Sequence, residues 1–224
     1  MNDQIQNILK GSLDLHVHAG PDAGPERRLD ALETARHAHE AEMAGFVLMS
    51  HDYPTAPLAH ALNQMYPGLQ IAGAITLNRS VGGLNPEAVE VSAKLGARVV
   101  WMPTFSADAW LRRAGKAPGI SIANDDGRLA PEVIEILEVV LRYDMVLASG
   151  YVSPSEALAL FREASSRGIT RMLAMHPGGV ATVAEQQEMA SLGAYLEHTF
   201  LSCMPSGGGT SIGDLVSSLN TLGL

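Results

Sequence analysis

The chain of 224 residues is long enough for one domain with a substantial buried core, and its 46% hydrophobic and 17% charged residues are typical of a globular protein. A formal net charge of −9 argues against nucleic acid as the main partner, and no apolar run reaches the roughly 18 residues of a membrane span. The first residues lack a secretory-signal pattern, and the single cysteine, Cys203, cannot form an internal disulfide, so we expect a cytoplasmic protein.

Short apolar runs recur along the chain, and each run ends in polar residues, proline or histidine. Runs of this kind, rich in Val, Ile, Leu and Ala, are typical of strands buried on both faces of a parallel sheet. The segments between them have the length and composition of helices, and Ser153 or Ser155 is expected to cap one of them. We predict strands at about 12–18, 46–50, 70–77, 98–103, 145–150, 170–175 and 193–197, with helices that include 29–43, 131–143, 153–168 and roughly 209–221.

Strands that alternate with helices at this spacing are βα units. Seven such units with polar residues at the strand ends indicate the α/β class and a (β/α)8 TIM-type barrel. An open doubly wound sheet is the alternative, but no glycine-rich dinucleotide turn follows the first strand. Because an eighth strand is missing from the count, we expect one barrel domain over residues 1–224 that is incomplete at its carboxyl end.

The longest irregular segment, 104–130, follows the fourth strand. Segments of this length in a compact domain are often lids or contact the substrate, and the alternative is a surface excursion. The sequence leaves these two interpretations equally open.

The first strand carries the pattern His16-Val17-His18. Residues two apart on a strand face the same way, so we expect Asp14, His16 and His18 to point into the barrel, and the intervening apolar residues to face the helices. Neutral imidazoles are good ligands for a Zn²⁺-like ion, and two of them on one strand form a preformed pair. The pattern therefore predicts a metal site, against the alternative of an exposed strand that happens to carry histidines.

Other strand ends offer similar groups to the same rim. His51 follows the second strand, His176 follows the sixth, and Glu197 and His198 end the seventh. Since Glu197 and His198 are adjacent on a strand, only one of them can face inward. Glu197 is a candidate metal ligand or general base, and the other interpretation is an ordinary rim residue. The remaining histidines, His37, His39 and His60, fall within predicted helices and are interpreted as surface or helix-packing residues.

Two further residues at strand ends are candidate substrate contacts. Arg79 follows the third strand and could hold a carboxylate or phosphate with two hydrogen bonds, or else pair with a surface aspartate. Tyr151 follows the fifth strand and could hydrogen-bond a substrate oxygen, or else serve only in packing. We carry Glu197, Tyr151 and Arg79 forward as the candidate catalytic residues.

The set of strand-end motifs resembles the amidohydrolase superfamily of metal-dependent barrels. The motifs are "DLHVHAGPD", "SHDYPTAPLA", "LNRSVGGLNPEAVE", "WMPTFSA", "SPSEAL" and "MHPGG", and together they are similar to a mostly uncharacterised amidohydrolase-like branch. The resemblance covers nearly the whole chain from about residue 12. The first-strand histidine pair is shared widely, whereas the full set of motifs is more specific.

The resemblance implies that His16, His18 and the strand-six His176 are metal ligands. The chain departs from the family pattern at three places. The fourth strand ends in Trp101-Met102-Pro103, where the family often has a bridging Lys or Glu, and Tyr151 stands where a strand-five histidine is usual. The family's strand-eight aspartate, which orients the attacking water, has no counterpart in this sequence. His51 and Glu197 are the residues that could complete the ligand set.

The favoured interpretation is a metal-dependent hydrolase. One or two divalent ions, zinc first with iron, manganese or nickel as alternatives, would activate water against an amide, ester, lactone or thioester bond of a small-molecule substrate. Asp14 is a candidate for fixing one of the imidazoles from behind. A phosphoesterase of the PHP type, which also uses a first-strand histidine pair, is the alternative enzyme. The alternative from another class is a catalytically lapsed barrel that binds a metal or a ligand, and a homo-oligomer is left open.

Overall fold

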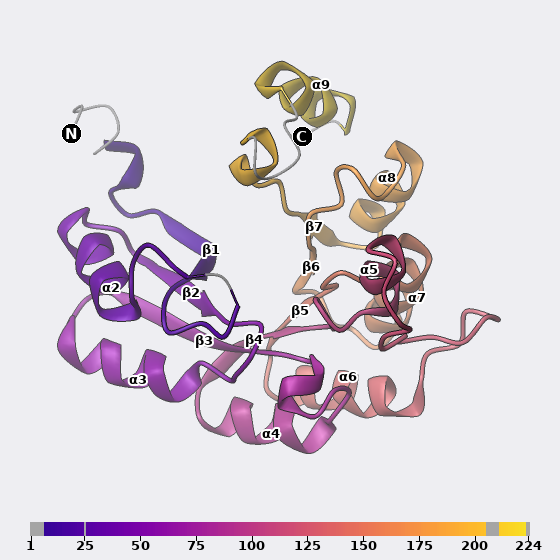
Figure 1. Ribbon diagram of the computed structural model, residues 1–224, viewed down its shortest axis with the longest axis horizontal. Coiled ribbons are helices and arrows are strands. Elements are labelled where there is room, and N and C mark those ends of the chain that lie inside the picture. Colours follow the sequence, from indigo (N-terminus) through magenta and orange to yellow (C-terminus); the bar gives the residue numbers. More distant parts are fainter. Residues whose placement is uncertain (1–6, 25, 205–210, 223–224) are drawn as a thin grey trace.

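A computed structural model, which describes residues 7–24, 26–204 and 211–222, contains a curled sheet of seven parallel strands in the order β1 to β7. Helices lie between successive strands and cover the outside of the curl (Figure 1). The α/β class and a TIM-type barrel that lacks one strand are thus confirmed. The strands are β1 (Leu13–His18), β2 (Gly45–Met49), β3 (Gln70–Thr76), β4 (Ala97–Trp101), β5 (Val146–Ala148), β6 (Met172–Ala174) and β7 (Ala194–Leu196).

The helices follow the predicted segments closely, and the predicted last helix is observed from residue 212, with residues 209 and 210 outside the described part. Ser153 caps α7 and forms a capping box with Glu156, as the sequence pattern suggested. The helices are α2 (Ala31–Glu40), α3 (Ala56–Met65), α4 (Pro86–Lys94), α5 (Asp108–Arg113), α6 (Pro131–Arg142), α7 (Pro154–Ser166), α8 (Val183–Ser191) and α9 (Ile212–Leu222), with short 3₁₀ turns η1 (Arg79–Val81) and η2 (Phe200–Cys203). Among the described helices, none combines the length and the hydrophobicity that crossing a membrane requires.

The core has an outer and an inner part, because the strands are buried on both faces. Outside the sheet, apolar side chains pack against the covering helices in two clusters. Inside the curl, a third cluster fills the barrel with side chains from successive strands. Burial of this apolar surface provides most of the folding free energy. The inner cluster contains Val47, Met49, Ala74, Val99, Trp101, Ala148, Leu173 and Met175.

The predicted alternation along the first strand is wrong in one respect. The pairing of β1 with β2 shifts register between Asp14 and Val17, so that β1 contains one residue more than its partner over this stretch. Such a bulge reverses which residues face inward. As a result Asp14 pairs with Phe46, a residue of an outer cluster, and is exposed rather than directed into the barrel. Leu13 and Leu15, predicted to face the helices, line the cavity described next.

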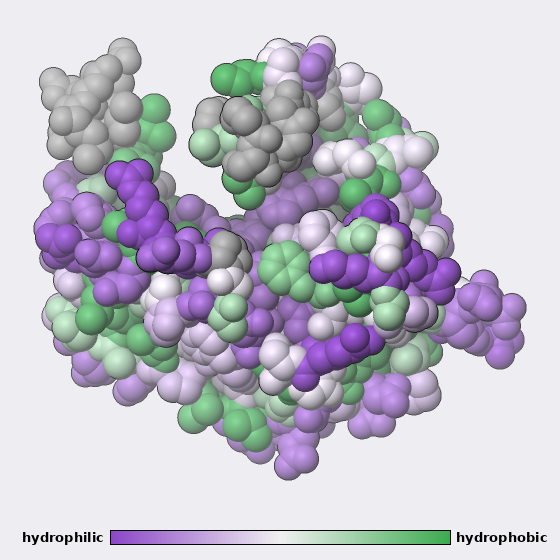
Figure 2. Space-filling view, viewed as in Figure 1, coloured by the Kyte–Doolittle hydropathy of each residue, from purple (hydrophilic) through white to green (hydrophobic). Residues whose placement is uncertain are grey.

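The sheet does not close into a full barrel within the described residues, because β1 and β7 are its two edges and do not pair with each other. Figure 2 shows the molecule hollowed between the side of β1 and the side of α9. Leu13, Leu15 and Tyr195, on these edge strands, are 54%, 49% and 75% exposed. They line a cavity of about 670 Å³ together with residues of the other strands.

Gly150 lies two residues beyond β5 and directly before Tyr151, where the strand ends are tightly packed. Its φ is +63°, and a Cβ atom there would lie 2.2 Å from the carbonyl oxygen of Met102. We expect Gly150→Ala to lower the free energy of unfolding by at least about 3 kcal/mol, since it combines left-handed strain with a backbone clash. The control Gly168→Ala has a φ of +85° but no described atom within 4 Å of the added Cβ, and should cost only about 1 kcal/mol. Urea unfolding measures both, and equal losses would contradict the packing argument.

Candidate metal centre

The carboxyl ends of the strands bring five candidate ligands to one rim. His16 and His18 lie at the end of β1, His51 is two residues beyond β2, His176 is two residues beyond β6, and Glu197 directly follows β7. Because all seven strands run parallel, their ends meet at the same side of the barrel. Four strands that are separated in the sequence thus contribute to one group.

The group is compact and centred on His16. The His16 Nδ1 atom lies 2.7 Å from Glu197 Oε1, and His16 Nε2 lies 3.0 Å from His18 Nε2. His176 Nδ1 lies 3.5 Å from the other Glu197 oxygen, Oε2. One ligand atom from each of His16, His176 and Glu197 falls within 4.8 Å of the others. Imidazole nitrogen and carboxylate oxygen are the donors that zinc and similar divalent ions take in catalytic sites.

Several polar atoms of this group are buried without a partner. His18 Nδ1, His176 Nδ1 and Glu197 Oε2 are inaccessible to solvent and make no hydrogen bond to any described residue. A buried polar atom left without a partner costs about 1–3 kcal/mol, so such atoms are rare unless a ligand satisfies them. The donor types and the unsatisfied atoms both fit a divalent cation bound among these side chains.

Burial keeps His18, His51 and His176 in the neutral form that binds metal. It lowers the pKa of His18 to about 3, with further lowering from the neighbouring His16 and His51. The pKa of His51 falls to about 4, chiefly through burial and then through His16. Burial also lowers the pKa of His176, although the negative charge of Glu197 opposes this effect. These histidines are therefore unprotonated at neutral pH, as metal coordination requires.

His51 is held from behind by a buried hydrogen-bonded chain. Its Nδ1 lies 2.8 Å from the hydroxyl of Thr104, and that hydroxyl also accepts a hydrogen bond of 2.7 Å from the side-chain amide of Asn78. If the imidazole donates from Nδ1, Nε2 is left with a free lone pair. Its ring lies 4.7 Å, centre to centre, from the ring of His18. Neighbouring groups of this kind orient imidazoles toward a metal.

Tyr151 lies at the edge of the group. Its ring centre is 6.2 Å from that of His51 and 6.3 Å from that of His176. Burial, together with the charge of Glu197, raises the pKa of Tyr151 to about 12. Its hydroxyl therefore stays protonated at neutral pH and is able to donate a hydrogen bond.

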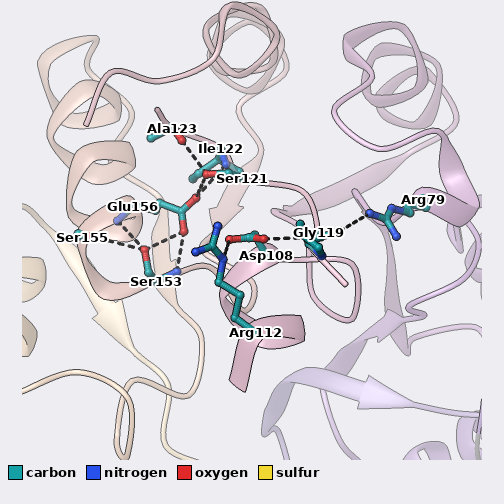
Figure 3. Close-up of polar contacts among 11 residues, drawn as sticks. Arg79, Asp108, Arg112, Gly119, Ser121, Ile122, Ala123, Ser153, Ser155 and Glu156 are labelled. Atoms are coloured by element: carbon teal, nitrogen blue, oxygen red, sulfur yellow. Dashed lines mark hydrogen bonds and ion pairs between the residues drawn. The ribbon is translucent and has the colours of Figure 1, made fainter. Parts of the chain in front are cut away.

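The structure does not bring Arg79 to this group. Its guanidinium donates to the carbonyl of Pro118 at 2.9 Å, within a network that holds the segment after β4 (Figure 3). Asp14 does not contact an imidazole either, since its carboxylate accepts from the backbone N–H of His16 at 3.0 Å. The contact to the His16 ring comes from Glu197 instead. His37, His39 and His60 are exposed on helices α2 and α3.

The segment between β4 and α6 supplies aromatic residues that the sequence did not single out. The ring of Phe105 lies 4.0 Å from that of His51, and Trp110 stacks on Tyr151 at 4.9 Å. The segment therefore contacts residues of the candidate site, while its role as a lid or in substrate contact stays a prediction. The length of this segment and its aromatic residues could have indicated a contact with the site, but neither predicts which side chain reaches the rim.

A second group next to His18 and His51 was also missed. Asp22 pairs with Arg27 at 2.6 Å, and its side chain is 4% exposed. Burial would raise the pKa of Asp22, but hydrogen bonds from the Gly24 N–H and from Arg27 outweigh it and lower that pKa. Burial and the adjacent Asp22 carboxylate raise the pKa of Asp52. The only indication in the sequence was that Asp22 and Asp52 both come shortly after a strand end that carries a histidine.

Comparison with known families gives one match. The model of a family described as "Family of unknown function (DUF6282)" matches residues 11–197. This range includes all seven strands and every candidate metal ligand. No curated protein sequence matches the chain.

Solved structures with a similar fold include an amidohydrolase from Pseudomonas aeruginosa, with a TM-score of 0.62 and 14% identity over 97% of this chain and 73% of that one. The probable dipeptidase PvdM from Pseudomonas aeruginosa has a TM-score of 0.59 and 11% identity over 87% of this chain and 62% of its own. An organophosphorus hydrolase from Deinococcus radiodurans has a TM-score of 0.55 and 15% identity over 85% of this chain and 60% of its own. The chain thus spans less than two thirds of the last two proteins. At these identities the likeness establishes the fold alone, and that fold agrees with the barrel that the sequence resemblance implied.

The low pKa of His18 predicts a pH-dependent stability of the metal-free protein. Because the folded-state pKa of about 3 lies below the ordinary value of 6.5, the unfolded chain binds more protons, and stability is lost as the pH falls through 6.5 towards 3. We expect His18 to account for a loss of about 2 kcal/mol between pH 7 and pH 5. Urea unfolding after treatment with a chelator should show this loss reduced in His18→Asn. The control His37→Asn should retain it, and an unchanged pH profile in His18→Asn would contradict the assignment.

Proposed function

This chain belongs to the DUF6282 family, and we propose that it is a metal-dependent hydrolase that cleaves an amide, ester, lactone or thioester bond of a small molecule. The main observation behind the proposal is that ligand atoms of His16, His176 and Glu197, from the ends of three different strands, lie within 4.8 Å of one another. The fold shared with proteins named as an amidohydrolase and a hydrolase supports it.

The proposed ligands are His16, His18, His176 and Glu197, with His51 completing the set. The arrangement resembles catalytic rather than structural sites, because it lies at the open rim of a barrel and not in a closed cage of cysteines. Zinc is the first candidate, since histidine nitrogen and a carboxylate suit it, while iron, manganese and nickel take similar ligands. A divalent ion bound there would lower the pKa of a coordinated water and polarise a carbonyl oxygen.

The chain's own residues would handle the proton and the substrate. Glu197 keeps one oxygen against His16, while the other, Oε2, has no hydrogen-bond partner among the described residues and is the proposed acceptor of a proton from the attacking water. The hydroxyl of Tyr151, whose pKa is raised to about 12, is the proposed hydrogen-bond donor to a substrate oxygen. Phe105 and Trp110 cover the same side and would limit access of bulk water.

The proposal is tested first through metal content. We expect the purified protein to carry about one divalent ion per chain, and His16→Ala and His176→Ala to lower its affinity for that ion at least about tenfold, because each removes a ligand. His60→Ala removes an exposed histidine from α3 and should leave the metal content unchanged. Elemental analysis after dialysis against a weak chelator measures all four proteins. Equal metal content in wild type and ligand variants would contradict the proposed centre.

A hydrolysis screen tests the chemistry separately. Metal-loaded protein should cleave at least one carboxyl ester, lactone, amide or thioester, and Glu197→Gln should lower kcat/KM at least about 100-fold on that compound, since it removes the proton acceptor. The screen includes phosphate esters, because activity confined to them would identify a phosphoesterase instead. A protein that binds the ion but cleaves no compound in any class would be a lapsed barrel.

A further inference from the structure

A cavity of about 390 Å³ adjoins the candidate metal centre on the side of β5, β6 and β7. His176 and Tyr151 lie on its wall, so the centre and the cavity share two residues. Its deeper walls come from the ends of β5 and β6 and from helices α7 and α8. The buried apolar residues among them are Val152, Ala157, Ala174, Met175 and Met189. We call this space the apolar cavity.

Flat and aliphatic side chains form the part of the apolar cavity nearest to solvent. Trp110 from α5 stacks on Tyr151 with ring centres 4.9 Å apart and planes inclined by 30°. Leu201 from η2 lines the cavity as well. Trp110 is 36% exposed and Leu201 is 53% exposed, although both are large and apolar. Apolar side chains left accessible around a cavity often mark where a ligand covers them.

The hydroxyls of Ser149, Thr199 and Ser202 in the cavity wall are already engaged by the backbone. The hydroxyl of Ser149 accepts from the N–H of Met175 at 2.9 Å. The Thr199 hydroxyl accepts from the N–H of Leu201 at 3.2 Å, and the Ser202 hydroxyl donates to the carbonyl of Thr199 at 2.8 Å. Among the described residues that line the cavity, the basic side chains are those of His176 and Arg113, and Arg113 is exposed. The interior therefore favours an apolar occupant over a polar one.

We propose that the apolar cavity binds an aromatic or cyclic apolar group of the substrate, placed a short linker away from the bond that is cleaved at the metal centre. This inference rests on the proposed function, since His176 and Tyr151 connect the two spaces. A cavity of about 150 Å³ lined by apolar side chains is enough to hold benzene. A space of about 390 Å³ therefore accommodates a six-membered ring together with a linker.

The test compares two probes that share a metal-binding head. Acetohydroxamate and benzohydroxamate carry the same chelating group, and only the second carries a ring. Isothermal titration of the zinc-loaded protein should show benzohydroxamate binding at least about tenfold more tightly, because the ring is transferred from water into the apolar cavity. Equal affinities for the two probes would overturn the inference while leaving the metal centre intact.

Matched variants locate the ring. Trp110→Ala and Leu201→Ala alter two different walls of the apolar cavity, and each should reduce the advantage of benzohydroxamate several-fold without changing the affinity for acetohydroxamate. Leu141→Ala is the control, because Leu141 on α6 is apolar and 49% exposed, close to the 53% of Leu201, and does not line the cavity. An unchanged advantage in both Trp110→Ala and Leu201→Ala, or an equal loss in Leu141→Ala, would overturn the assignment of the ring to this cavity.

A third measurement separates this inference from the metal centre. Benzamide is neutral, and it should bind saturably to chelator-treated protein and change the fluorescence of Trp110. This change should disappear in Trp110→Phe, because the tryptophan that remains, Trp101, is fully buried. Acetamide should cause no such change. Absence of saturable benzamide binding would overturn the inference whether or not the hydroxamates bind the loaded protein.

Discussion

The contact between Glu197 and His16 is the constraint on which the candidate site depends. β1 and β7 are the two edges of the sheet, and their backbones do not pair within the described part of the chain. The 2.7 Å contact therefore joins the first and the last strand through side chains alone, at the rim where the parallel strands end. Because the curl of all seven strands decides how far apart these edges lie, the spacing of the ligands is a property of the whole sheet.

The rim is locally unfavourable for stability. His176 has a φ of +46°, a conformation that costs a residue other than glycine about 1–2 kcal/mol. Three polar atoms of the proposed ligand side chains are buried without partners among the described residues. The pKa values of His18 and His51 are lowered far from 6.5, mainly by burial. Similar features are also found singly elsewhere, since Trp101 Nε1 in the inner cluster and Gln186 Oε1 on α8 are buried without a hydrogen-bond partner among the described residues. Several unfavourable features in one group of neighbouring side chains are expected where function, and not stability, has selected the residues.

The repeating part of the molecule could be predicted from the sequence. Apolar runs between helical segments located all seven strands to within a few residues, and the parallel arrangement then placed His51 and His176 at the same rim as the first-strand pair. The inward direction of Asp14 could not be predicted, because the bulge in β1 depends on pairing with β2 and leaves no mark in a single strand. Similarly, the sequence allowed either Glu197 or His198 to face inward, and only the curl of the sheet brings Glu197 against His16.

The aromatic residues that shape access to the centre lie in the inserted segment, and their positions could not be predicted. The segment has no periodic sequence pattern, and contacts with residues distant in the sequence set its position. Glu156 couples this segment to the barrel: one carboxylate oxygen accepts from the backbone and hydroxyl of Ser153 at the start of α7, and the other accepts from Ser121 and Ile122 (Figure 3). Ser153 follows Tyr151 by two residues, so the same carboxylate fixes both the start of α7 beside Tyr151 and the segment that carries Trp110. The cap of α7 and the anchor of the segment that carries Trp110 thus share one carboxylate, which ties the long irregular insertion to the strand end that bears Tyr151.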